Sequence, residues 1–283
     1  MAQLTVLISC KDQQGIIANT TQCVAKNHGN IVYIDQHVDG HDKVFFMRIE
    51  CVFTVENSAS HFREQFELGP VKTFQMDYEI TSDAHKPVMA LMVSKYDHCL
   101  YDLLGRYRSG EMDVEIPLII SNHIDLKPIA DAFEIPFYHI PVDAKNKDTA
   151  EDQQLELLHS HKVDFIVLAR YMQIVSEKFL SHFKNSVINI HHSFLPAFPG
   201  AKPYHSAYKR GVKIIGATSH YVTKDLDEGP IIEQDVAHVD HAHSINDLII
   251  KGRDLEKVVL ARAIKKHLKR KVLVYNNKTI VFR

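Results

Sequence analysis

The chain has 283 residues, of which 45% are hydrophobic and 24% are charged, and its formal net charge at pH 7 is −2. This composition is typical of a globular protein of two domains, and a charge near zero gives no indication of nucleic-acid binding. We expect neither a signal peptide nor a membrane span, because there is no basic leader and no long apolar run. The four cysteines have no paired spacing, which favours reduced thiols and a cytoplasmic location.

The first eighty or so residues predict a small domain of β-α-β-β-α-β order, the ferredoxin-like arrangement. We expect strands at 4–9, 30–38, 43–53 and 72–79, and helices from about 16 to 28 and from 59 to 66. The turn from Asp39 to Asp42 contains Gly40 and has the composition of a hairpin connection.

A polar stretch that ends in Pro87 predicts a linker, so we divide the chain into a first domain at 1–82, a linker at 83–87 and a second domain at 88–283. Near-continuous apolar runs occur in the second domain at 88–94, 114–121 and 163–169, and helical patterns follow at 98–107, 125–134 and 148–160. Such runs are typical of parallel strands covered on both faces. The expected fold class is therefore α/β, with a Rossmann-like second domain and a mainly parallel sheet. Ser244 is the expected N-cap of a long helix near the end of the chain.

The most informative segment of the second domain is VINIHHSFLPAFPG, residues 187–200. Asn189 and His191 are two residues apart, so their side chains share one face of an extended strand. An amide that stabilises an oxyanion and an imidazole that moves a proton are suited to acyl chemistry. The prolines and Gly200 predict an irregular loop after the strand. A purely structural role for the two histidines is the alternative.

A second polar cluster follows at 216–232, GATSHYVTKDLDEGPII. It places His220 in a predicted strand and three acidic residues in a turn before Gly-Pro. If Asp227 reaches His191, the carboxylate orients the imidazole and favours its charged form. A metal site built from His191, His192 and Asp227 is a competing hypothesis.

These motifs resemble the signature of the folate-dependent formyltransferases and hydrolases: Asn-Ile-His before Ser-Phe-Leu-Pro, then His-Tyr-Val and Leu-Asp-Glu-Gly-Pro. The resemblance covers nearly the whole chain and is greatest for the formyltetrahydrofolate deformylases, because transferases usually have Pro where this chain has His192. It implies that Asn189, His191 and Asp227 are the catalytic residues and that His220 has a supporting position. It implies neither a metal nor a bound cofactor.

The loop after the first strand of the second domain favours hydrolysis over transfer. In transformylases of purine synthesis this loop is rich in glycine and cradles a phosphate, whereas here it reads Ser94–His98 without glycine. The expected reaction is hydrolysis of 10-formyltetrahydrofolate to formate and tetrahydrofolate, which supplies formate for purine biosynthesis and balances one-carbon folate pools. Formyl transfer to an amine and a non-catalytic folate or amino-acid sensor are the alternatives. Whether His191 or Asp227 takes the proton stays open.

The resemblance also implies which residues bind the folate substrate. They lie after the strand at 163–169 and in and beside the acidic loop: Met172, Gln173, Ile174, Val175, His220 and Asp225.

The first domain is similar to an ACT domain, a class that commonly binds amino acids, often across a dimer interface. The expected effector site is the junction of the first strand and helix, where helix N–H groups favour a carboxylate: Asp12, Gln13, Gly15 and Ile16. Alternatively, Gly15 only shapes the turn and the domain only dimerises. We expect a homo-oligomer, a dimer or tetramer, with a folate substrate and neither nucleic-acid nor membrane partners.

Overall fold

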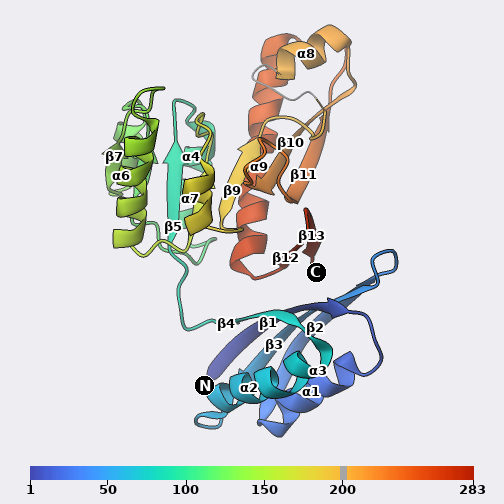
Figure 1. The fold of residues 1–283 in the computed structure, drawn as a ribbon. Coiled ribbons are helices and arrows are strands. Elements are labelled where there is room, and N and C mark those ends of the chain that lie inside the picture. The colour runs from blue at the N-terminus through green and yellow to red at the C-terminus, as the bar shows by residue number, and fades with distance from the viewer. Residues whose placement is uncertain (198–202) are drawn as a thin grey trace. The chain divides into compact units, whose positions relative to one another are not determined.

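The computed structural model describes residues 1–197 and 203–283 and divides into two compact units (Figure 1). The first unit contains Met1–Lys86, Arg270–Leu273 and Ile280–Arg283. The second contains Pro87–Lys269 and Val274–Thr279.

The grouping of the last residues differs from our division, which assigned all of 88–283 to the second domain. Backbone atoms near the C-terminus are hydrogen-bonded to side chains of the first unit. Arg48 Nε donates to the carbonyl of Arg270 at 2.8 Å, and the Tyr33 hydroxyl donates to the carbonyl of Arg283 at 2.5 Å. These long-range bonds have no signature in the local sequence pattern.

The first unit is a four-stranded antiparallel sheet in the order β2-β3-β1-β4 with helices on one face, as Figure 1 shows. Its elements are β1 (Ala2–Lys11), α1 (Ile16–Lys26), β2 (Gly29–Asp39), β3 (Val44–Phe53), α2 (Ser58–Phe66), the π-helical turn η1 (Glu67–Val71), α3 (Lys72–Phe74) and β4 (Asp77–Ser82). The predicted β-α-β-β-α-β order and the ACT-like ferredoxin fold are confirmed.

The strand predicted at 72–79 is wrong in its first half. The chain stays helical through Phe74, and Gln75, with a φ of 51°, ends the helix before β4 begins at Asp77. Phe74 and Met76 are both buried in the core of the first unit. The apolar residues before β4 therefore fill the core from a helical turn and its exit, which an alternating pattern does not distinguish from a strand.

The second unit contains a seven-stranded sheet in the order β11-β10-β9-β8-β5-β6-β7. Its strands are β5 (Met89–Val93), β6 (Ile119–Ser121), β7 (Phe137–His139), β8 (Phe165–Leu168), β9 (Val187–His191), β10 (Ile214–Tyr221) and β11 (Ile231–His238). Its helices are α4 (His98–Arg108), α5 (Lys127–Ala132), α6 (Lys147–Ser160), α7 (Glu177–His182), α8 (Pro203–Arg210) and α9 (Ile245–Leu268). The chain ends in a two-stranded sheet of β12 (Val272–Tyr275) and β13 (Lys278–Val281).

The order of the strands determines where a site can form. Strands β7, β6, β5, β8 and β9 run parallel, whereas β10 and β11 are antiparallel additions. From β5 the chain moves to β6 on one side and later returns to β8 on the other, so β5 and β8 flank a topological switch point. Ligands bind at the carboxyl ends of strands beside such a point. The mainly parallel α/β sheet is as predicted.

Helix α9 begins as its sequence predicts. The Ser244 hydroxyl accepts the N–H of Asp247, and the Asp247 carboxylate accepts the N–H of Ser244, which forms a capping box. Within the parts of the chain that the structure describes, no helix is both long and apolar enough to cross a membrane.

Phe62 lies at the centre of the first unit, fully buried, with its ring 5.2 Å from that of Phe53 and 5.4 Å from that of Phe66. We expect Phe62→Ala to destabilise this unit by about 3–5 kcal/mol, since it leaves a cavity in a close-packed core. Hydrogen exchange followed by mass spectrometry should show faster exchange in β1 and β3. Val55→Ala, at an exposed position, is the control and should leave the exchange of both strands unchanged.

Candidate active site

The three residues predicted to be catalytic lie together, and His220 joins them. Strand β9 carries Asn189 and His191, and the loop after β10 carries Asp227. His191 Nδ1 lies 3.1 Å from Asp227 Oδ2, and His220 Nε2 lies 3.7 Å from Asp227 Oδ1. The amide nitrogen of Asn189 lies 3.3 Å from His220 Nε2. The four side chains thus form one polar cluster.

The pairing of β9 with β10 brings His220 to this cluster. His220 is the cross-strand partner of Asn189, and the pairing of β10 with β11 shifts between Ser219 and His220. Irregularities of this kind re-aim side chains and are common beside active sites. The buried His220 is therefore part of the site, a role that its position in a predicted strand could not decide.

The loop that carries Asp227 folds tightly back on the end of β10. The Tyr221 N–H donates to the carbonyl of Pro230 at 2.9 Å, and a Cβ at Gly229 would lie 1.7 Å from the carbonyl oxygen of Tyr221. Glycine is required at that close approach. Asp227 itself has a φ of 58°, a left-handed conformation that is unfavourable for most residues and is concentrated at functional sites.

Asp227 is held in its ionised form. Burial by itself raises the pKa of this carboxyl, but its interactions with His191 and His220 outweigh burial and hold the pKa well below the usual range. The carboxylate is therefore charged throughout the physiological range and accepts a hydrogen bond from His191 Nδ1–H. The other ring nitrogen of His191, Nε2, is buried and has no hydrogen-bond partner among the described residues.

His220 orients the amide of Asn189. Its Nδ1 lies 2.9 Å from the carbonyl oxygen of Tyr221, to which it donates, and in the tautomer with its proton on Nδ1 the ring presents a lone pair at Nε2. That lone pair accepts one hydrogen of the Asn189 amide. The second amide hydrogen of Asn189 stays available for another acceptor.

A cavity of about 240 Å³ opens at this cluster and includes most of the predicted folate-binding residues. Its walls contain Asn189, His191, His192, His220, Asp227 and the whole segment 170–175. This segment includes four of the predicted folate-binding residues, Met172, Gln173, Ile174 and Val175. Asp225 is not among its described lining residues; the Asp225 carbonyl accepts from the Thr223 hydroxyl and the Glu228 N–H, which shapes the loop. The largely apolar walls suit a flat ring system with a few polar groups.

Sequence reasoning did not identify the residues that hold this wall in place. Ser94 is buried and accepts the N–H of Met172 at 2.9 Å. It lies in the loop that sequence reasoning considered only because the loop lacks glycine. The Ser94 hydroxyl donates to the side chain of Asn122 at 2.6 Å. A polar residue directly after a buried strand was the available signal. The residues Phe198–Gly200 of the predicted loop lie outside the described part of the chain.

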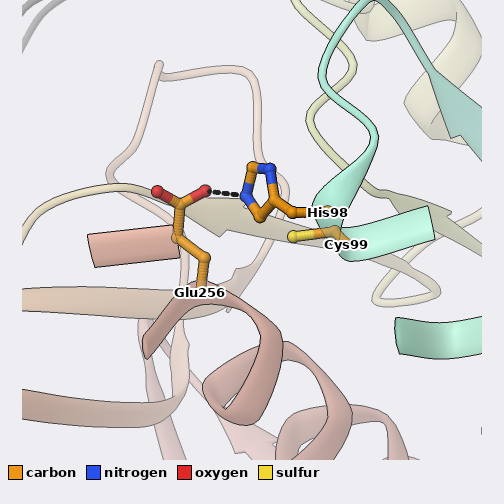
Figure 2. Close-up of side chains that lie close together, drawn as sticks. All are labelled: His98, Cys99 and Glu256. Atoms are coloured by element: carbon orange, nitrogen blue, oxygen red, sulfur yellow. Dashed lines mark hydrogen bonds and ion pairs between the residues drawn. The ribbon is translucent and has the colours of Figure 1, made fainter. Parts of the chain in front are cut away.

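A second polar cluster, shown in Figure 2, joins the start of α4 to α9. His98, Cys99 and Glu256 are side chains of metal-binding type, and their ligand atoms lie within 4.8 Å of one another. Glu256, however, already accepts from Tyr204 at 2.8 Å and pairs with His98 Nε2 at 2.8 Å. Arg170 Nε lies 3.4 Å from the same carboxylate.

Electrostatics favour an ion network over a metal at this cluster. Burial raises the pKa of Glu256, but the partners just described overcome it and lower the pKa below its usual range. Burial raises the pKa of the Cys99 thiol well above its ordinary value, so the thiol stays protonated. A neutral thiol and a guanidinium at the carboxylate both oppose cation binding.

Comparison with known proteins agrees with the geometry. The family model for formyl transferases matches residues 88–264. The chain is 51% identical to formyltetrahydrofolate deformylase of Synechocystis sp. over 98% of both chains, and 45% identical to that of Bacillus subtilis over 98% of this chain and 93% of the relative.

Solved structures give the same result. The crystal structure of a formyltetrahydrofolate deformylase from Pseudomonas syringae pv. tomato has a TM-score of 0.95 at 46% identity, and the match covers 100% of this chain and 95% of the other. Glycinamide ribonucleotide transformylase 1 from Symbiobacterium toebii has a TM-score of 0.68 at 27% identity, covering 71% of this chain and 97% of its own. From its sequence and its fold, the chain belongs to the formyltetrahydrofolate deformylases, within the formyl transferase family.

Proposed function

We propose that the chain hydrolyses 10-formyltetrahydrofolate to formate and tetrahydrofolate. The observation that carries this proposal is the environment of the two ring nitrogens of His191. Its Nδ1 is held by the ionised Asp227 at 3.1 Å, while its buried Nε2 has no partner among the described residues, and His191 and Asn189 both line the cavity. This is the arrangement of a general base with its orienting carboxylate.

In the mechanism that we propose, the free amide hydrogen of Asn189 binds the formyl oxygen. His191 Nε2 takes a proton from water as the water oxygen attacks the formyl carbon, and Asp227 stabilises the imidazolium that forms. The tetrahedral oxyanion is stabilised by Asn189. As the C–N bond breaks, the imidazolium returns the proton to the leaving nitrogen, so formic acid, which ionises to formate, and tetrahydrofolate are the products.

We propose further that the pterin lies against the segment from Met172 to Val175, beside the loop of Asp225 and Asp227. Met172 and Ile174 are 48% and 57% exposed although they are apolar, and Leu226 of the loop is 63% exposed. Apolar side chains around the mouth of a cavity are covered when a flat ligand binds.

Water is favoured over an amine as the acceptor by the loop at Ser94–His98. Instead of a glycine-lined cradle, this loop presents Tyr96, whose ring lies against the Arg170 guanidinium at 4.8 Å from ring centroid to Cζ. A sensor without catalysis would have no need of the ordered cluster of Asn189, His191 and Asp227.

Incubation with 10-formyltetrahydrofolate alone should release formate, and Asn189→Ala, His191→Ala and Asp227→Asn should each lower kcat by about 10²–10⁴-fold. Formate release measures this directly. Glu228→Gln changes an exposed carboxylate of the same loop and should retain the wild-type rate. Formate release that requires an added amine would instead indicate transfer, and a wild-type rate in one of the three variants would remove that residue from the mechanism.

We also propose that the chain forms a homo-oligomer through its first unit. Edge strand β2 exposes Val32, Ile34 and Val38 at 51%, 42% and 37%; Ile34 and Val38 share one face of the strand, and the pairing with β3 shifts at Val32. An exposed apolar edge is a site for pairing with a second copy.

Ile34→Asp should shift the protein toward the monomer in size-exclusion chromatography with light scattering, because it places a charge in the apolar strip. Val55→Asp introduces the same charge at an exposed valine outside β2 and should leave the molar mass unchanged. A monomeric wild-type protein would contradict the proposal.

An amino-acid effector is proposed for the junction formed by Asp12, Gln13, Gly15 and Ile16. Gly15, whose φ is 95°, is the N-cap of helix α1 and provides no side-chain cap, so the first N–H groups of the helix suit a carboxylate. Calorimetric titration with glycine and with methionine should show saturable binding that acetate does not reproduce. If neither amino acid gives more heat than acetate, the effector proposal fails for both.

We place the protein in the cytoplasm. Its four cysteines are free and buried, and burial raises the pKa of Cys10 to about 11 and that of Cys51 to about 12. Protonated, inaccessible thiols of this kind are expected of a reducing compartment.

A further inference from the structure

Arg170 occupies an unusual position directly after β8. Its φ is 65°, and only 8% of the residue is exposed. A left-handed conformation is unfavourable for a residue with a Cβ, and burying a guanidinium is unfavourable unless it is paired. Such a residue persists where its side chain is tightly held by its surroundings.

Glu256 supplies the negative charge that holds Arg170. It is 1% exposed on α9, with Arg170 Nε 3.4 Å from Oε2, and its hydrogen bonds with His98 and Tyr204 keep it in place (Figure 2 shows the pair with His98). The helix makes room for Tyr204 at Gly252, one turn earlier, where a Cβ would lie 2.0 Å from the Tyr204 hydroxyl.

The other end of the Arg170 guanidinium contacts the second histidine of the doublet. Arg170 Nη1 lies 2.5 Å from His192 Nδ1. A guanidinium has only donors, so Nδ1 of His192 must accept with its lone pair. The ring is therefore neutral, and its one proton is on Nε2.

The charged and titratable groups that the structure describes around His192 reinforce this state. Arg170 faces it from the end of β8, the ring of Tyr204 lies 6.0 Å away on α8, and that of His191 lies 5.1 Å away on β9. Asp227 and His220 lie beyond His191, and Glu256 and His98 lie beyond Arg170. A proton at Nδ1 would point at a fixed positive charge, which also argues against a cation shared by His191 and His192.

We propose that the Glu256–Arg170 pair holds His192 as an uncharged Nε2–H donor at the wall of the active-site cavity, so that within the doublet His191 alone changes charge during the reaction. The inference rests on the proposed hydrolysis and adds Arg170 and Glu256 to it as positioning residues. Keeping His192 neutral avoids a second positive charge beside the imidazolium of His191, which would make proton uptake there less favourable.

The wild-type protein tests the proposal without any substitution. In ¹⁵N-histidine spectra, His192, assigned by the loss of its signals in His192→Gln, should stay a neutral Nε2–H tautomer from pH 5 to pH 8. Titration of His192 near the ordinary histidine pKa of about 6.5 would overturn the proposal. The spectra need no turnover, so they remain decisive even if the wild-type protein releases no formate, a result that would refute the hydrolysis alone.

Arg170→Gln should allow His192 to become protonated, which adds an ionisation near pH 6.5 to the pH profile of kcat. Most of the loss of activity should occur below that pH. Arg253→Gln is the matched control, because Arg253 is the other guanidinium over the ring of Tyr96, at 6.0 Å, and should leave both readouts unchanged. An Arg170→Gln protein whose His192 stays neutral and whose pH profile matches the wild type would refute the role of Arg170.

His192 variants separate the donor from mere packing. His192→Gln places an amide N–H near the position of Nε2, whereas His192→Asn keeps an acceptor for Arg170 but is too short to replace the donor. We expect His192→Gln to retain about tenfold more kcat than His192→Asn. Equal rates in the two variants would show that the Nε2–H is not used.

Discussion

The active-site geometry depends on one ionised carboxylate, Asp227, held between two imidazoles. Asp227 has a left-handed backbone in a loop folded back at Gly229, and its interactions with His191 and His220 more than offset burial of its charge. The carboxylate holds Nδ1 of His191 and leaves Nε2 for the proposed proton transfer, while the Tyr221 carbonyl holds His220, which in turn orients the Asn189 amide. One carboxylate and one backbone carbonyl therefore orient three side chains.

The sheet explains why these groups meet. Parallel strands β8 and β9 deliver the segment 170–175 and the doublet of His191 and His192 to one edge, and antiparallel β10 adds His220 opposite Asn189. The remaining wall is held from β5, where Ser94 accepts the N–H of Met172. The residues that we propose for catalysis and binding thus come from separate segments whose spacing is set by strand pairing rather than by loop flexibility.

In the buried network centred on Glu256, a carboxylate likewise holds neighbouring side chains in place, at a greater distance from the proposed reaction. Its members come from α4, α8, α9 and the end of β8, and every charge in it has a partner, as buried ions require. The cluster has the residue types of a metal site, yet the Glu256 carboxylate is already paired with His98, Tyr204 and the Arg170 guanidinium. In our inference, that arrangement keeps His192 neutral, so that His191 is the histidine of the doublet that changes charge.

Local pattern determined much of this protein: the β-α-β-β-α-β unit, the parallel strands, the cap at Ser244, and the two-residue spacing that puts Asn189 and His191 on one face. These follow from periodicity and turn chemistry, which act over a few residues. The helical turn before β4, the pairing of His220 with Asn189, and the contacts of Arg170 with Glu256 and His192 were decided only by the tertiary structure. They join residues far apart in the chain or depend on how buried charges are neutralised, and neither strand register nor burial of a charge is written in a local sequence pattern.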